Sequence, residues 1–322
     1  MDGYRLAAPI LFALDPEKAH SVGLSLMRFA SKTRTEPSPV ETSLGELANP
    51  LAIAAGYDKT GAHLRSLSRL GFGYLVAGTF TASPWSGNPR PRVARDRSEK
   101  TLVNALGFPN PGIDAFVLSL ASQGQIGVPV VASVSGKTEA EVVACYSKVQ
   151  PHVAGVELNL SSPNTPGLKD LREPAAFAEL AQAVKAAKVK PTYLKIPPYV
   201  DEAQFGGVAS LVRRWEDLGF EGVTASNSLP IEDPRMAVGR GGLSGPPLLE
   251  RTKAAVSRIR RASSLSFEVN ACGGVSSPAD ASSLLAIGAT TVQLFTALVY
   301  QGPSLVRQIL ADPDFRLSSR TR

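Results

Sequence analysis

The chain has 322 residues, of which 43% are hydrophobic and 19% are charged, and its formal net charge is +6. This composition predicts a folded soluble protein with one large α/β domain or two smaller ones, and it excludes a low-complexity or disulfide-stapled chain. The positive charge favours contact with anions such as phosphates, acidic substrates or an anionic membrane surface.

Neither a membrane span nor a zinc site is predicted. No stretch contains the roughly 20 consecutive apolar residues that a spanning helix needs, and the N-terminus lacks the pattern of a secretory signal. Cys145 and Cys272 form no CxxC pair, so we expect no metal site and a reducing compartment.

Residues 1–40 predict a pair of short helices. Asp15 is placed to cap the second helix, and Pro16 to occupy its first turn. One side of the pair is apolar and carries Leu6, Ile10, Leu11, Val22, Leu26 and Phe29. The pair is either a lid packed on the rest of the protein or a membrane-facing element whose apolar side enters the lipid boundary. The pattern alone favours the lid.

From residue 52 onward, short apolar strands alternate with amphipathic helices. The strands lack polar alternation, as expected for a parallel sheet that is buried on both faces. They are predicted at residues 52–57, 74–79, 129–134, 154–160, 192–196, 222–226, 267–271 and 290–295.

Helix signals separate these strands. Thr138 and Glu141 predict a capping box, Gly219 ends another helix, and Ser277 with Pro278 opens a third. Eight strand–helix units predict a (β/α)8 barrel. A doubly wound open sheet is the alternative, because the number of strands does not prove closure.

Polar residues follow the predicted strands at the end where such a barrel carries its active site. Four asparagines lie there or in the connecting loops, namely Asn104, Asn159, Asn164 and Asn227. Because an amide offers both donors and an acceptor, the four together favour a planar polar ligand, although asparagine is also common in turns.

Glycines and the placement of histidines add to this pattern. Gly273 and Gly274, with Thr296 after the next strand, predict a phosphate cradle, although a tight turn would use the same glycines. Structural roles are expected for the histidines, which are His20, His63 and His152. Without a histidine or paired carboxylates at the strand ends, the candidate base is Ser162 or Lys59.

Several motifs, in the same order along the chain, resemble the class 2 dihydroorotate dehydrogenases. They are "LDPEKAH", "AAGYDK", "GNPRPR", "LSSPNTPGL", "LKI", "GGLSG" and "VQLFTAL", and the likeness extends from about residue 5 to residue 310. The resemblance implies a (β/α)8 barrel that binds FMN and oxidises dihydroorotate to orotate in pyrimidine biosynthesis. It also implies electron transfer to a membrane quinone beneath the N-terminal helices. It therefore favours a membrane-facing pair at residues 1–40 and a catalytic barrel at residues 41–322.

The resemblance assigns roles to individual residues. Ser162 matches the base that removes the proton from C5 of the substrate while C6 gives hydride to FMN, and Lys195 matches the cation beside the reduced flavin. The residues that match substrate contacts are Lys59, Asn104, Ala105, Leu106, Gly107, Phe108, Asn159, Asn164, Asn227 and Ser228. Those that match the FMN site are Ala55, Gly56, Tyr57, Asp58, Lys59, Thr79, Ser133, Asn159, Lys195, Ser226, Gly245, Gly274, Phe295 and Thr296. His20 and Arg95 match quinone contacts.

The chain departs from the family pattern at a few positions. Ser133 stands where an asparagine is usual, and Phe295 where a tyrosine is usual. Leu11 and Val299 replace polar residues of the quinone tunnel. These departures leave the quinone species open.

Two other functions are compatible with parts of the sequence. One is an FMN dehydrogenase of the same fold that uses a soluble acceptor, fumarate or NAD. The other is a nucleic-acid-binding protein, which the absence of a basic run interleaved with aromatic residues disfavours. We expect a monomer on the cytoplasmic face of a bacterial inner membrane, with dihydroorotate, a quinone and lipid as its partners and no nucleic acid.

Overall fold

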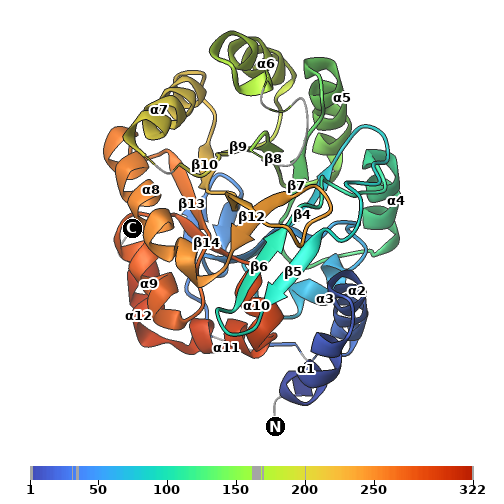
Figure 1. Cartoon of the computed structure of the whole chain (residues 1–322). Coiled ribbons are helices and arrows are strands. Elements are labelled where there is room, and N and C mark those ends of the chain that lie inside the picture. Colours follow the sequence, from blue (N-terminus) through green and yellow to red (C-terminus); the bar gives the residue numbers. More distant parts are fainter. Residues whose placement is uncertain are drawn as a thin grey trace.

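The computed structural model describes residues 3–30, 32–33, 36–161, 168, 170–199 and 201–320. Within these ranges, parallel strands close into a barrel in the order β10-β13-β14-β3-β4-β7-β8-β9 (Figure 1). The strands are β3 (Leu51–Asp58), β4 (Tyr74–Phe80), β7 (Val130–Val134), β8 (Gly155–Asn159), β9 (Thr192–Lys195), β10 (Gly222–Ala225), β13 (Glu268–Cys272) and β14 (Thr291–Leu294). The predicted barrel is confirmed, the open sheet is wrong, and each predicted strand ends within one residue of the observed one.

Helices surround this barrel (Figure 1). They are α3 (Leu64–Ser68), α4 (Ile113–Ser122), α5 (Glu139–Val149), α6 (Pro174–Ala187), α7 (Glu202–Asp217), α8 (Leu249–Ala262), α9 (Pro278–Ala286), α10 (Thr296–Gln301), α11 (Ser304–Ala311) and α12 (Pro313–Arg320). The predicted N-caps are present, since the side chain of Thr138 accepts a hydrogen bond from the backbone N–H of Glu141, and Ser277 accepts one from Asp280. The second half of the predicted capping box differs, because the Glu141 carboxylate accepts from the Lys137 N–H at 2.7 Å instead of the Thr138 N–H. These bonds satisfy N–H groups that a helix start leaves without a partner.

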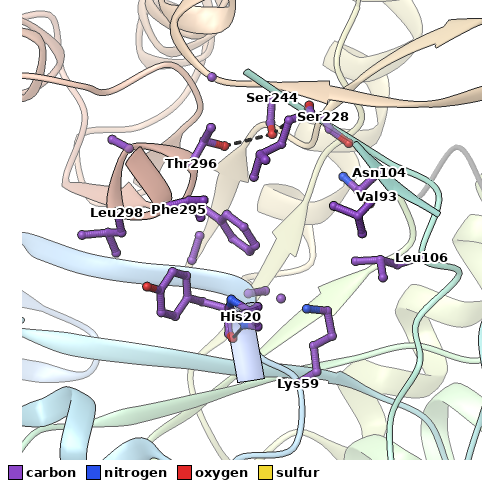
Figure 2. A pocket seen from close by; sticks show the side chains of 18 of the residues that line it. His20, Lys59, Val93, Asn104, Leu106, Ser228, Ser244, Phe295, Thr296 and Leu298 are labelled. Carbon is purple, nitrogen blue, oxygen red and sulfur yellow. Dashed lines mark hydrogen bonds between the residues drawn. The ribbon is translucent and has the colours of Figure 1, made fainter. Parts of the chain in front are cut away.

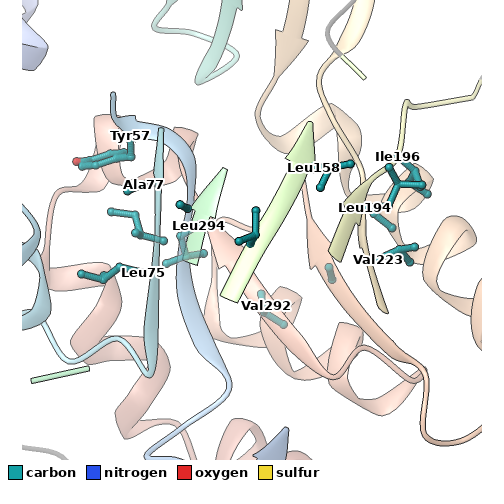
Figure 3. Close-up of a cluster of buried hydrophobic side chains, with 14 of the residues drawn as sticks. Tyr57, Leu75, Ala77, Leu158, Leu194, Ile196, Val223, Val292 and Leu294 are labelled. Carbon is teal, nitrogen blue, oxygen red and sulfur yellow. The ribbon is translucent and has the colours of Figure 1, made fainter. Parts of the chain in front are cut away.

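Successive side chains of a strand point to opposite faces of the sheet, and here the apolar and the polar side chains lie on different faces. Leu158, Leu194 and Val223 lie in the hydrophobic core between the strands and the helices (Figure 3). The neighbouring Glu157 and Thr224 are also buried, and a hydrogen bond joins them although β9 separates their strands. The apolar side chains therefore hold the helices onto the barrel, while a polar set fills its interior.

Smaller sheets cover the two ends of the barrel. An antiparallel sheet of β5 (Val93–Asp96), β6 (Thr101–Asn104), β11 (Leu229–Glu232) and β12 (Arg240–Ser244) lies over the mouth formed by the carboxyl ends of the strands (Figure 1). The hairpin of β1 (Val40–Thr42) and β2 (Gly45–Leu47) lies at the opposite end, where the Ser43 N–H donates to the Glu268 carboxylate. The sequence did not predict these strands, because they are only three to five residues long and some of them, such as β5 and β11, are only partly buried.

The N-terminal helices α1 (Gly3–Ala13) and α2 (Pro16–Leu26) lie beside β5 and β6 (Figure 1). Asp15 caps α2 as predicted, and its side chain accepts bonds from two backbone N–H groups at 3.1 Å. Leu11 is buried, whereas the other members of the apolar side are exposed, namely Leu6, Ile10, Val22, Leu26 and Phe29. This side therefore does not pack on the barrel as a lid would. No described helix is both long and apolar enough to cross a membrane.

The ring pair of Phe80 and Phe116 tests the packing of α4 on the barrel. Both side chains are fully buried, and their ring centroids lie 4.1 Å apart. Phe116→Ala should lower the free energy of unfolding by about 3–5 kcal/mol, because it removes apolar contacts and leaves a cavity. Leu118→Ala, on the exposed face of the same helix, is the control and should change it by less than about 0.5 kcal/mol. Equal losses in urea titrations of the two variants would contradict this packing.

Candidate active site

A cavity of about 510 Å³ lies at the carboxyl ends of the barrel strands, between the mouth and the N-terminal helices. Its size is typical of a site for a small molecule or cofactor. Figure 2 shows Phe295 on one side of this cavity and Lys59 and Asn104 on the other. The position agrees with the prediction that the chemistry of this barrel lies at its strand ends.

Three of the four predicted asparagines line the cavity, namely Asn104, Asn159 and Asn227. Asn227 Nδ2 donates to Ser161 Oγ at 2.9 Å, and Ser161 Oγ donates to Asn159 Oδ1 at 3.0 Å. The Asn159 amide is thus held from both ends, because its Nδ2 also donates to Thr79 Oγ1 at 2.9 Å. Side chains with fixed amide directions can recognise the edge of a planar polar ligand.

Two lysines, the buried Lys195 and the partly buried Lys59, bring positive charge to the cavity. Burial lowers the pKa of the Lys59 ammonium to about 8, although Glu17 and Asp58 oppose this shift. Lys195 Nζ lies 3.8 Å from Cys272 Sγ. Burial lowers the pKa of Lys195, but Cys272 and Glu157 outweigh burial and leave it above its usual value. Both lysines are therefore suited to an anionic ligand.

Two glycines of the cavity lining allow backbone segments to approach more closely than a side chain would permit. At Gly274 (φ +84°), a Cβ would lie 2.2 Å from the backbone nitrogen of Leu249. At Gly245 (φ +115°), it would lie 2.8 Å from the carbonyl oxygen of Lys100. Nearby, Thr296 Oγ1 donates to Ser244 Oγ at 2.9 Å (Figure 2). Bare backbone beside hydroxyl groups suits a phosphate.

One buried polar atom in the cavity lining awaits a partner. Gln293 Oε1 has no hydrogen-bond partner among the residues that the structure describes, while its Nε2 donates to Tyr74 Oη at 3.0 Å. A buried acceptor without a partner is costly, and a bound ligand would relieve it. Together with the lysines and the glycine loops, it fits a planar cofactor that carries a phosphate.

The part of the cavity beneath the N-terminal helices is aromatic and apolar. The Tyr57 ring packs edge-on against both His20 and Phe295, with centroid distances of 5.1 and 5.4 Å. Leu11 and Val299 complete this wall. The cavity thus joins a polar region at the barrel mouth to an apolar region beneath α1 and α2.

The two predicted quinone contacts, His20 and Arg95, line the cavity, and each already contacts at least one backbone carbonyl oxygen. His20 Nε2 is 2.6 Å from the carbonyl oxygen of Tyr57. The Arg95 guanidinium donates to the carbonyl groups of Leu11, at 3.0 Å, and Phe12, at 3.3 Å, where α1 ends. Arg95 therefore stabilises the end of this helix, and any contact it makes with a ligand is additional to that role.

Some predicted site residues lie elsewhere. Asp58, Ala105 and Ser133 do not contribute to the cavity lining. Asp58 accepts hydrogen bonds from the following turn, Ala105 is buried in a small apolar cluster, and Ser133 lies inside the barrel. Ser162 and Asn164 lie outside the described residues. The other residues predicted for the substrate and FMN sites line the cavity, namely Ala55, Gly56, Tyr57, Lys59, Thr79, Asn104, Leu106, Gly107, Phe108, Asn159, Lys195, Ser226, Asn227, Ser228, Gly245, Gly274, Phe295 and Thr296.

Further polar residues at or beside the cavity were not predicted. Ser161 connects two of the amides, Ser244 contacts Thr296, and Gln293 carries the unpaired oxygen. Ser161 and Ser244 directly adjoin residues that the motifs identified, and Gln293 is a polar residue within an apolar strand. These signals were present in the sequence.

The chain is similar to known proteins over most of its length. A family model for dihydroorotate dehydrogenase matches residues 40–313. The dihydroorotate dehydrogenase (quinone) of Aromatoleum aromaticum is 34% identical over an alignment of 337 positions, gaps included. The alignment covers 97% of this chain and 95% of the relative. That of Flavobacterium lutescens is 34% identical over 331 residues and covers 94% of each chain. The chain belongs to the dihydroorotate dehydrogenase family.

A solved structure shares the fold of this chain. The crystal structure of the Eimeria tenella DHODH in complex with ferulenol superposes with a TM-score of 0.82 at 23% identity, over 92% of this chain and 90% of that one. Dihydroorotate dehydrogenases are flavin-dependent oxidoreductases, which agrees with the fit of the cavity to a planar cofactor with a phosphate.

The stability of this member of the dihydroorotate dehydrogenase family should depend on pH through His20. Burial, and after it the positive charge of Lys59, lowers the pKa of His20 to about 3. The unfolded chain, with a pKa near 6.5, therefore binds a proton that the folded protein excludes between about pH 3 and pH 6.5. The stability that His20 contributes is complete above about pH 6.5 and decreases by up to about 1.4 kcal/mol per unit as the pH falls. Urea titrations at several pH values should show a shallower acid dependence for His20→Gln, and an unchanged dependence would contradict a buried neutral imidazole.

Proposed function

We propose that the chain oxidises (S)-dihydroorotate to orotate in pyrimidine biosynthesis, binds FMN in the cavity, and passes electrons to a membrane quinone. The observation that carries this proposal is the single cavity that joins two unlike regions. Three amides and two lysines surround its polar region, which suits a planar anion. Its apolar region opens beneath α1 and α2, where a hydrophobic electron acceptor can approach.

The residues that would hold FMN are those that already fit a planar cofactor with a phosphate. Gly245, Gly274 and Thr296 would bind the phosphate, and the unpaired Gln293 oxygen would face the cofactor side of the cavity. When bound, FMN supplies the acceptor for hydride. Lys195 would place its ammonium beside the cofactor, where a buried positive charge favours a negatively charged reduced form.

The substrate would occupy the space between the amides and Lys59. Asn104, Asn159 and Asn227 would hydrogen-bond the ring, and the Lys59 ammonium would pair with the substrate carboxylate. Ser162 would take the proton from C5, and Asn164 would bind the ring beside it. Both follow Ser161 closely in the sequence, and the support for their roles is the motif "SSPN" in a chain of this family.

The visible absorption spectrum of the purified protein tests this function directly. The protein should be yellow, and anaerobic addition of dihydroorotate should bleach it. Turnover with a quinone analogue should exceed turnover with fumarate or NAD. A colourless protein would contradict FMN binding, and turnover with only the soluble acceptors would identify the same-fold dehydrogenase instead.

Ser162→Ala should slow flavin reduction by dihydroorotate by about 10²–10⁴-fold, because a positioned base contributes about that much to rate. Stopped-flow absorbance measures this step without a quinone. The variant should keep the wild-type content of bound FMN, which serves as the control for folding. Reduction at the wild-type rate would assign the base to another group.

The exposed apolar side of the N-terminal helices supports a second part of the proposal. Residues 1–40 would form a membrane-facing pair on the inner membrane of a bacterium, and residues 41–322 a catalytic barrel that works as a monomer. Leu6, Ile10 and Phe29 are each at least 67% exposed. Apolar side chains gathered on one side of a short helix pair are suited to the lipid boundary.

Replacing Ile10 and Phe29 together with glutamate should weaken binding to vesicles of phosphatidylglycerol and phosphatidylethanolamine by at least about tenfold, because each apolar side chain contributes about 1.5–3 kcal/mol on burial. Co-sedimentation measures the bound fraction. Leu118→Glu, an equally exposed apolar position on α4, is the control and should bind as the wild type does. Equal loss in the control and the double variant would refute a docking side on α1 and α2.

A further inference from the structure

A glutamate lies inside the barrel, below the cavity, and the proposed chemistry gives it no role. Glu157, on β8, is 1% exposed and does not line the cavity. Its Oε1 accepts a hydrogen bond from Ser133 Oγ at 3.1 Å, and its Oε2 accepts one from Thr224 Oγ1 at 2.8 Å. Strands β7 and β10 supply these donors, so the carboxylate is held by strands on both sides of its own.

The hydrogen bonds continue from Glu157 to the cavity. Ser133 Oγ lies 3.0 Å from Thr79 Oγ1, which accepts a bond from Asn159 Nδ2 at 2.9 Å. Beyond Asn159, the bonds pass through Ser161 to Asn227. A continuous relay thus joins the buried carboxylate to two of the amides that line the site.

The carboxylate determines the direction of this relay. An ionised carboxylate can only accept, so Ser133 must donate its single proton to Glu157. Thr79 must then donate to Ser133, which leaves the Thr79 oxygen as an acceptor for the Asn159 amide nitrogen. Asn159 therefore turns its oxygen toward Ser161 and Asn227. A neutral group at position 157 could also donate, and the relay could then reverse as a unit.

We propose that Glu157 is a positioning residue, which acts through Ser133 and Thr79 to fix the orientation of the Asn159 and Asn227 amides toward the ligand. This inference rests on the proposed function, because the ligand that the amides meet is the substrate ring. Glu157 touches neither the substrate nor the cofactor in this role.

The charge of Glu157 has a counterpart in Lys195 on the neighbouring strand. Asn159 is the register partner of Lys195, and Glu157 lies two residues earlier on β8. The negative charge of Glu157 is one of the causes that raise the pKa of the buried Lys195 ammonium above its usual value. A cation favours the ionised form of a carboxyl group that interacts with it, and the direction of the relay requires that form.

Glu157→Gln tests the relay, with Glu268→Gln as its matched control. Glu268 is also a buried carboxyl group on a barrel strand with two donors, Ser43 N and Tyr193 Oη, but it lies outside the relay. The dissociation constant of orotate, measured from the absorbance change of the bound flavin, should rise about tenfold in Glu157→Gln, the value of one well-placed hydrogen bond. It should stay at the wild-type value in Glu268→Gln.

Variants of Ser133 distinguish the loss of the relay from a general loss of stability. Ser133→Ala breaks the relay and should weaken the binding of orotate as Glu157→Gln does. Ser133→Thr keeps the hydroxyl group and should bind orotate as the wild type does. Unfolding temperatures of all the variants control for stability. Wild-type affinity in Glu157→Gln, or an equal loss in Glu268→Gln, would overturn the inference alone. A wild-type protein that binds no orotate would overturn the proposed function together with the inference.

Discussion

Closure of the barrel is the constraint on which the other features of this protein depend. Closing a parallel sheet turns alternate side chains of every strand inward and brings all the carboxyl ends to one mouth. Here the inward positions include Glu157, Lys195 and Thr224, which would be unfavourable on a strand buried between apolar layers. These side chains can pair through hydrogen bonds and opposite charges only because the strands surround a common interior.

The cover of the mouth depends on a different set of contacts. Glu17 on α2 forms an ion pair with Arg92, whose Nη2 lies 2.9 Å from the carboxylate, and Arg95 donates to carbonyl groups at the end of α1. These contacts hold the N-terminal helices over the apolar part of the cavity while most of their apolar side remains exposed. The same helices can therefore form one wall of the cavity and offer a surface to lipid.

Much of the fold could be predicted because its signals are local. Apolar runs marked each barrel strand to within one residue, and Thr138, Asp15 and Ser277 cap helices as their spacing predicted. The antiparallel sheet over the mouth could not be predicted, because a strand such as β5 lacks a clear alternation and the sheet is completed only when β6 pairs with the distant β12. Arg95 was identified as a site residue, but its bonds to α1 are visible only in the folded chain.

The sequence by itself determined the positions of the strands and helices, the caps, and which polar residues follow each strand. The tertiary structure decided that the sheet closes, that Asn104, Asn159 and Asn227 share one cavity, and that Asp58 and Ser133 lie outside its lining. The physical reason is distance along the chain. A cap or an amphipathic pattern involves residues within about four positions, whereas Glu157 and the Thr224 hydroxyl that it accepts from are 67 residues apart and meet only across the closed barrel.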